Sequence, residues 1–343
     1  MPDIEFGCLP TVIGSMPHAD PKAACSVVGR YLKDIPAWPQ LPRRTFREDM
    51  CVQFSEGFPG LVVNEQEKSI RVDRSQDLNK PLEKLYSAYL ENKVDSYPVS
   101  PEYAAGLHNF LELTNLTPRA VKGQVTGPIT WGTTITDGEK AIIYDETLGD
   151  AAAKMLRLKA AWQEKALRKI SRNTIIFVDE PSMVSFGSVA LLVSKEKVVS
   201  LIDEVFGGIS GLKGVHCCGN TDWSVILATK ADIVSFDAYN YGQSLSLYPN
   251  EVKKFLDRNG AIAWGIIPNN EEALAKESVA SLKDRLEETM APFTRKDIPF
   301  RQLFRQGLLT PSCGLAALAT SEAAGRAMEL LTELSKAMKK RYL

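Results

Sequence analysis

The fold is decided by TIIFVDEPSM (174–183), an apolar, β-branched run that the helix-like KEKVVSLIDEVF (195–206) separates from a second such run, GLKGVHCCGN (211–220). Short β-branched runs that end in Gly, Pro, Ser or Asn are typical of buried strands. A strand, a helix and a further strand in this order predict a parallel βαβ unit.

The same alternation of strand-like and helix-like segments runs along the rest of the chain. Eight apolar runs are candidate strands: 11–15, 60–66, 119–130, 174–183, 211–220, 231–240, 261–269 and 308–318. Eight such units over 343 residues fit a TIM (β/α)8 barrel better than an open doubly wound sheet. The chain also lacks the G-x-G-x-x-G pattern that a dinucleotide-binding sheet would favour. We therefore expect one catalytic barrel over residues 1–343, with the Pro-containing segment 34–57 as a loop-rich excursion.

Charge and hydropathy exclude several classes of protein. The chain carries 41 Lys and Arg against 42 Asp and Glu, so it has no basic excess with which to bind nucleic acid. No run approaches the roughly 18 uninterrupted apolar residues that a membrane span requires. The first ten residues, MPDIEFGCLP, lack the apolar centre of a signal peptide. We expect a cytoplasmic protein with neither a nucleic acid nor a membrane as partner.

Polar residues gather where the candidate strands end. Catalytic residues of a TIM barrel lie at the C-terminal ends of the strands and in the loops that follow. These ends carry Ile13-Gly14-Ser15, Asn64-Glu65, Thr126-Gly127-Pro128, Asp179-Glu180-Pro181, His216-Cys217-Cys218, Asp237, Pro268-Asn269 and Cys313-Gly314. The sequence therefore predicts an active site at this end of the barrel.

A metal site is one interpretation of His216, Cys218 and Cys313. Residues two apart in a strand face the same side, so His216 and Cys218 can point at one atom while Cys217 points away. One imidazole and two thiolates suit Zn²⁺, and three protein ligands with an exchangeable fourth position are typical of a catalytic zinc. Asp237 is a candidate fourth ligand. The alternative is that these cysteines are inert core residues and that the histidine is structural.

Two further features predict substrate contacts. Asp179 and Glu180 end an apolar strand, where buried carboxylates require partners: one could bind a substrate amine and the other a basic side chain. The alternative is an acid at the start of a helix whose first turn contains proline. In Ile13-Gly14-Ser15, glycine permits a close backbone approach, and the turn could hold a carboxylate by its N–H groups.

Seven motifs together resemble a known family. They are T-V-I-G-S (11–15), R-E-D-M (47–50), G-x-V-T-G-P-I-T (123–130), V-D-E-P (178–181), H-x-C (216–218), A-D-x-x-S (231–235) and P-S-C-G-L (311–315). In their order and spacing they are similar to the C-terminal, catalytic barrel of cobalamin-independent methionine synthase. The broader superfamily includes uroporphyrinogen decarboxylase and corrinoid-dependent methyltransferases. The resemblance covers most of the chain, but the additional N-terminal barrel of the full-length family has no counterpart, which implies a short form.

The resemblance implies a zinc ion that binds a substrate thiol as a thiolate. By the family's pattern His216, Cys218 and Cys313 are its protein ligands. Asp237 is the nearest match to a glutamate that serves as a further ligand, and its shorter side chain differs from that pattern. Zinc lowers the pKa of a bound thiol, which provides a nucleophile at neutral pH.

The resemblance also implies the substrate, L-homocysteine, and the residues that bind it. Ile13, Gly14 and Ser15 would hold the homocysteine carboxylate, and Asp179 would bind its amino group as the catalytic acidic residue. Glu180, adjacent to Asp179, is a further candidate for substrate binding. The implied activity is methyl transfer to the homocysteine thiol, which yields methionine.

One departure from the family bears on the methyl donor. The family carries a histidine near the seventh strand end, which acts as the acid that activates methyltetrahydrofolate; here that segment is WGIIPNN (264–270). Methyl transfer from a tertiary amine needs a protonated leaving group, whereas cob(I)alamin leaves without one. We therefore expect methylcobalamin or a methylated corrinoid protein as the donor, in preference to methyltetrahydrofolate.

Three alternatives share parts of this pattern. A methylcorrinoid:coenzyme M-type thiol methyltransferase would use the same histidine and cysteines, but coenzyme M has no amine for Asp179 to bind. A metal-free lyase of the uroporphyrinogen decarboxylase type would need basic residues for its many carboxylates, and the strand ends carry acids and thiols. A corrinoid-protein partner without catalytic activity would not require the metal-binding pattern.

Overall fold

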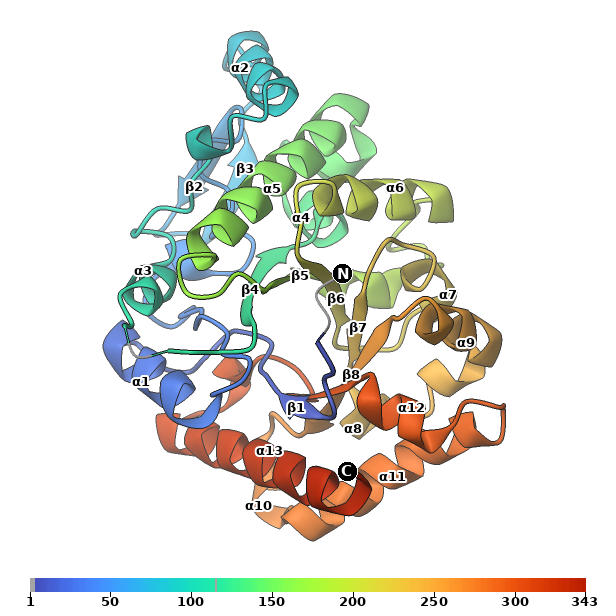
Figure 1. The fold of residues 1–343 in the computed structure, drawn as a ribbon. Coiled ribbons are helices and arrows are strands. Elements are labelled where there is room, and N and C mark those ends of the chain that lie inside the picture. Colours follow the sequence, from blue (N-terminus) through green and yellow to red (C-terminus); the bar gives the residue numbers. More distant parts are fainter. Residues whose placement is uncertain (1–3, 115) are drawn as a thin grey trace.

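A computed structural model describes residues 4–114 and 116–343 and confirms the α/β, TIM-like barrel class. Seven parallel strands form one curled sheet in the order β1-β9-β8-β7-β6-β5-β4, with helices around its outside (Figure 1). The strands are β1 (Leu9–Pro10), β4 (Val121–Thr126), β5 (Thr174–Asp179), β6 (Leu212–Cys217), β7 (Ile233–Phe236), β8 (Ala261–Ile267) and β9 (Gly307–Pro311).

Helices follow most of these strands, as the alternating sequence pattern predicted. The helices are α1 (Pro21–Tyr31), α2 (Asn79–Leu90), α3 (Ala105–Leu111), α4 (Pro128–Thr134), α5 (Glu146–Leu167), α6 (Lys195–Phe206), α7 (Trp223–Ile226), α8 (Ala238–Tyr241), α9 (Pro249–Asp257), α10 (Glu271–Lys276), α11 (Val279–Thr294), α12 (Phe300–Arg305) and α13 (Ser321–Tyr342). Within residues 4–114 and 116–343, no helix combines the length and the apolar character that crossing a bilayer requires.

The second candidate strand, 60–66, was wrongly placed in the barrel. It forms β2 (Leu61–Asn64), which pairs antiparallel with β3 (Ser69–Val72) in a separate two-stranded sheet. Only four polar residues lie between the two strands, and so short a connection can reverse the chain but cannot carry the crossover that a parallel strand needs. The expected strand-end pair Asn64-Glu65 is therefore not part of the barrel's strand-end cluster.

The position between β1 and β4 is filled by residues 36–40, inside the predicted excursion 34–57. Lys122 donates its backbone N–H to Pro36, and Gln40 donates its own to Gly14. Isolated parallel bridges join Ala37 to Lys122 and Ser15 to Gln40. Because proline lacks an N–H donor, this segment bridges the two edges without forming a regular strand. The excursion is loop-rich, as expected, but its first part also bridges the two edges of the sheet.

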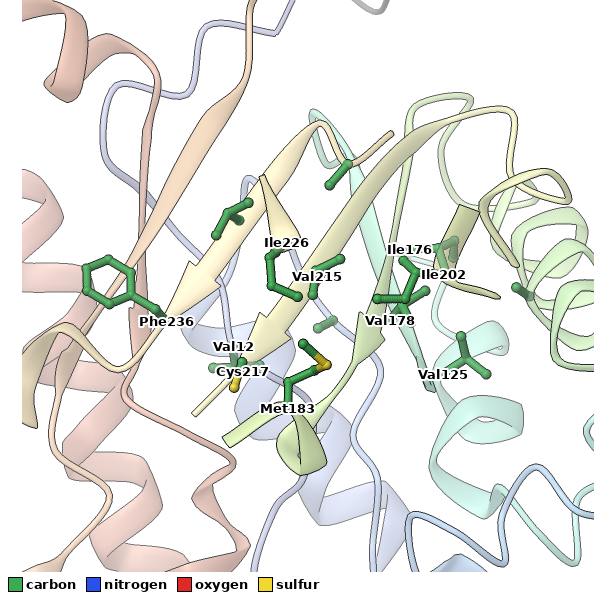
Figure 2. Close-up of a cluster of buried hydrophobic side chains, with 14 of the residues drawn as sticks. Val12, Val125, Ile176, Val178, Met183, Ile202, Val215, Cys217, Ile226 and Phe236 are labelled. Carbon is green, nitrogen blue, oxygen red and sulfur yellow. The ribbon is translucent and has the colours of Figure 1, made fainter. Parts of the chain in front are cut away.

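Side chains alternate between two apolar cores across the sheet. On β5, Ile176 and Val178 belong to the outer core beneath the helices, which Figure 2 shows, whereas Ile175 and Phe177 belong to the inner core of the barrel. Successive residues of a strand face opposite sides, so Asp179 is directed into the barrel. On β6 the outward positions are Val215 and Cys217, which directs His216 inward.

Candidate metal and substrate site

The structure brings His216, Cys218 and Cys313 together. One imidazole nitrogen and the two sulfur atoms all lie within 4.8 Å of one another. His216 lies in β6, Cys218 directly follows that strand, and Cys313 follows β9. The predicted trio therefore assembles from two non-adjacent strands, at their carboxyl ends, with spacing that a single metal ion could bridge.

The hydrogen bonding of His216 fits a metal ligand. Its Nδ1 lies 3.0 Å from the Ser235 hydroxyl, on the neighbouring strand β7. Its Nε2 is buried and has no hydrogen-bond partner, which is costly for a polar atom inside a protein. A proton on Nδ1, donated to Ser235, leaves the Nε2 lone pair for a metal ion.

The two thiols also fit a metal site. A hydrogen bond between them lowers the pKa of Cys218 and raises the pKa of Cys313, which favours the thiolate at Cys218. A divalent cation would favour ionisation of both sulfurs, because a coordinating thiol is deprotonated. The donor set of one imidazole and two sulfurs matches the preferences of Zn²⁺.

Asp237, the expected fourth ligand, is not part of this group. Its carboxylate caps α8, where it accepts hydrogen bonds from the backbone N–H and from the side-chain amide of Asn240, at 2.8 and 2.7 Å. Each carboxylate oxygen accepts one of these bonds and keeps a further lone pair, so the contact with Asn240 does not by itself prevent ligation. The structure groups three residues that could hold a metal ion and leaves the role of Asp237 as a prediction.

A cavity of about 380 Å³ opens beside the three candidate ligands. Its wall includes Ile13 and Ser15 of the predicted turn, and Asp179 at the end of β5. The Asp179 carboxylate is buried, and its Oδ1 has no hydrogen-bond partner. Burial raises the pKa of Asp179, while the charge on Lys122 acts in the opposite direction. An orphaned carboxylate oxygen in a cavity of this size is suited to binding a ligand's ammonium group.

The Ile13-Gly14-Ser15 turn requires glycine at its centre. Gly14 has φ of +150°, and a Cβ placed there would lie 2.6 Å from the Gln124 side chain and 2.7 Å from that of Gln40. Glycine alone accepts such a conformation without strain. Ser15 packs against Gly314, which follows Cys313, so the turn lies next to the metal group.

Glu180, a predicted substrate-binding residue, is not among the described residues that line the cavity. Glu180 is fully buried, and its two oxygens accept hydrogen bonds from the backbone N–H groups of Ile129 and Thr130 and from the Thr130 hydroxyl. These donors lie in the first turn of α4, where a negative charge is favourable. Glu180 therefore caps α4. The alternative from the sequence also placed an acid at a helix start, but at the helix that follows Pro181, and substrate binding by Glu180 stays a prediction.

We expect the Glu180→Gln substitution to lower stability without removing a bound metal. The amide has one acceptor oxygen for three donors, and its NH2 group faces one of them. Loss of charged hydrogen bonds in a buried position costs about 2–3 kcal/mol. Thermal unfolding and zinc content of the variant test this: full stability, or a loss of zinc, would contradict the capping role.

Ser235 was missed by the sequence analysis, which placed it in a motif without a role. We expect the Ser235→Ala substitution to weaken zinc binding by roughly 10–100-fold, because a ligating histidine loses the partner that fixes its tautomer and orientation. Competition with a chromogenic chelator measures this affinity. Ser235→Thr, which keeps the hydroxyl, is the control; equal affinities for alanine and threonine variants would remove the role.

Gln40 and Glu48 were also missed, and they reach the cavity from the excursion. Asn269 and Gly314, which belong to the predicted strand ends, reach it from the loops after β8 and β9. Burial raises the pKa of Glu48, whose Oε1 accepts a hydrogen bond from Arg44 at 2.7 Å. The position of strand ends identified Asn269 and Gly314, whereas Gln40 and Glu48 lie in a segment with no strand signal.

Neither a protein-family model nor a curated protein sequence matches the chain. Two solved structures are similar along almost its whole length. One is a B12-independent methionine synthase from Shewanella sp. W3-18-1 in complex with selenomethionine, at 15% identity and a TM-score of 0.58, covering 97% of this chain and 98% of the other. The second is a methyltransferase from Methanosarcina mazei, at 13% identity and a TM-score of 0.57, covering 99% and 95%. At such low identities the likeness establishes a shared fold.

Proposed function

We propose that the chain is a zinc-dependent methyltransferase that methylates the thiol of L-homocysteine to form methionine. The observation that carries this proposal is the convergence of His216, Cys218 and Cys313 beside a cavity that contains the orphaned carboxylate of Asp179. The similarity in fold to a methionine synthase and to a methyltransferase is in accord with it.

The proposed roles divide the cavity into a sulfur end and an amino-acid end. A zinc ion held by His216, Cys218 and Cys313 would lower the pKa of a bound thiol, so that the thiolate exists at neutral pH. Asp179 would accept hydrogen bonds from the homocysteine ammonium group. Backbone N–H groups of the Ile13-Gly14-Ser15 turn would hold the carboxylate, which fixes the direction of the sulfur.

We propose methylcobalamin or a methylated corrinoid protein as the donor. The thiolate sulfur attacks the methyl carbon, a sulfur–carbon bond forms, and the cobalt–carbon bond breaks with its electron pair remaining on cobalt. No proton is needed at this leaving group. The cavity of about 380 Å³ is near the lower end of the ~300–1,000 Å³ of small-molecule pockets, so it suits an amino acid, and a corrin ring would approach from its mouth.

The residues around the cavity favour this donor over a folate. Among the described residues that line it, His216 is the one histidine, and it is a proposed ligand. Asn269 lies in the loop where the family has the histidine that donates a proton to the folate. An amide side chain cannot protonate an amine. Apart from Asp179, the carboxylic acids that line the cavity are Glu48, which is bonded to Arg44, and Asp49.

Two comparisons of substrates test the proposal. With methylcobalamin as donor, L-homocysteine should be methylated faster than coenzyme M, because coenzyme M has no ammonium group for Asp179. Equal or higher activity with coenzyme M would favour the alternative thiol methyltransferase. With L-homocysteine as acceptor, methylcobalamin should support turnover and methyltetrahydrofolate should not; equal rates would overturn the donor assignment and make Glu48 the first candidate for the acid.

A further inference from the structure

The barrel contains a fully buried lysine that is bonded to the proposed carboxylate-binding turn. Lys122 lies in β4, and its ammonium group donates hydrogen bonds to the backbone carbonyl of Ile13 at 2.6 Å and to the side chain of Gln124 at 3.2 Å. The nitrogen also lies 4.3 Å from the centre of the Phe177 ring. Burying an ammonium group is costly unless it is paired, so the groups that surround it indicate what it stabilises.

Two of the segments that Lys122 contacts, the Ile13-Gly14-Ser15 turn and strand β5, contribute to the proposed amino-acid end of the cavity. The Ile13 carbonyl begins the Ile13-Gly14-Ser15 turn, which the lysine therefore ties to β4. Phe177, whose ring the ammonium group faces, is an inward residue of β5 two positions before Asp179, whose side chain faces the same side of the sheet. The buried ammonium group thus contacts the proposed carboxylate-binding turn and the strand that carries the proposed ammonium-binding acid.

We propose that Lys122 is a positioning residue that holds the Ile13-Gly14-Ser15 turn in place, at the end of the cavity that contains Asp179, for a zwitterionic amino-acid thiol. The inference rests on the proposed function. It assigns Lys122 to recognition of the amino-acid end and gives it no part at the metal end. Removing its charge should therefore weaken binding of homocysteine and leave binding of a thiol without ammonium and carboxylate groups unchanged.

The test compares L-homocysteine with 2-mercaptoethanol as ligands of the zinc-loaded protein, by calorimetry without a methyl donor. In Lys122→Met the affinity for homocysteine, divided by the affinity for mercaptoethanol, should fall by on the order of tenfold or more. Zinc content should stay at the wild-type level. In kinetic assays the loss should appear in KM for homocysteine, with kcat much less affected.

Lys159→Met is the matched control, because Lys159 is also fully buried and donates to a backbone carbonyl, that of Pro98, at 2.8 Å, away from the cavity. It should lose stability without any change in the affinity ratio. Lys122→Gln, which keeps a donor but no charge, provides a second variant. If either Lys122 variant folds and keeps the wild-type ratio of homocysteine to mercaptoethanol affinity, the inference is overturned. It is also overturned if neither Lys122 variant folds while Lys159→Met does. A wild type that binds zinc but not homocysteine overturns the proposed function as well.

Discussion

The Cys313→Ser substitution is expected to lower zinc affinity by at least about 100-fold and to abolish methyl transfer. Cys313 provides one of three candidate ligands, and loss of a residue that merely supports a ligand already costs roughly 10–100-fold. A serine hydroxyl is a much poorer ligand for zinc than a thiolate, since it does not ionise readily. Metal analysis of the purified variant, together with methionine formation from homocysteine and methylcobalamin, measures both effects.

Cys217→Ser is the matched control for that substitution. Cys217 is adjacent to Cys218, but it faces the outer core between the sheet and the helices (Figure 2). Burial raises its pKa to about 12, so this sulfur remains a thiol. Its substitution should cost some stability and retain zinc. If zinc survives in Cys313→Ser with activity unchanged, the ligand assignment fails; if Cys217→Ser loses zinc, the direction of the two side chains is wrong.

Gly14→Ala is expected to have the second largest effect, a loss of homocysteine binding together with lower stability. The added methyl group would overlap the side chains of Gln124 and Gln40, at 2.6 and 2.7 Å. Those side chains cannot move freely, because Gln124 donates to the Trp38 carbonyl and Gln40 donates to Gln53. The φ of +150° adds backbone strain, so that we expect a cost of about 2–4 kcal/mol.

Thermal unfolding and homocysteine titration of Gly14→Ala check this expectation, with Gly325→Ala as the control. Gly325 lies in α13, and a Cβ there would have no atom within 4 Å. Alanine in a helix interior is favourable by roughly 0.5–1 kcal/mol, so the control should be at least as stable as the wild type. Wild-type homocysteine affinity in Gly14→Ala would show that the turn does not bind substrate.

Much of the candidate site could be predicted because parallel strands end at one edge of a sheet. Period-two alternation directed Asp179, His216 and Cys218 inward once β5 and β6 were recognised as buried strands. Closure of the sheet then brought the end of β9, with Cys313, to the same place. The assembly of three ligands from distant segments thus follows from the barrel prediction and simple strand geometry.

The remaining features depend on tertiary contacts that carry no local signal. The apolar run 60–66 has the composition of a barrel strand, yet the short polar turn after it forces a hairpin. Residues 36–40 have the composition of a loop. They bridge the two edges of the sheet through backbone groups, which do not depend on the identity of the side chains. Asp179 and Glu180 are adjacent in sequence, and nothing local distinguishes their roles. Only the position of α4 shows that Glu180 caps a helix while Asp179 faces the cavity.

The most direct measurement compares zinc-free and zinc-reconstituted wild-type protein in methionine formation from L-homocysteine and methylcobalamin. Methyl transfer should be absent without metal and should rise in proportion to bound zinc, reaching its maximum at one equivalent per chain. The paired product, cob(I)alamin, should form in equal amount. Full methyl transfer by the zinc-free protein, or none at one bound zinc, would contradict zinc-dependent methylation of homocysteine.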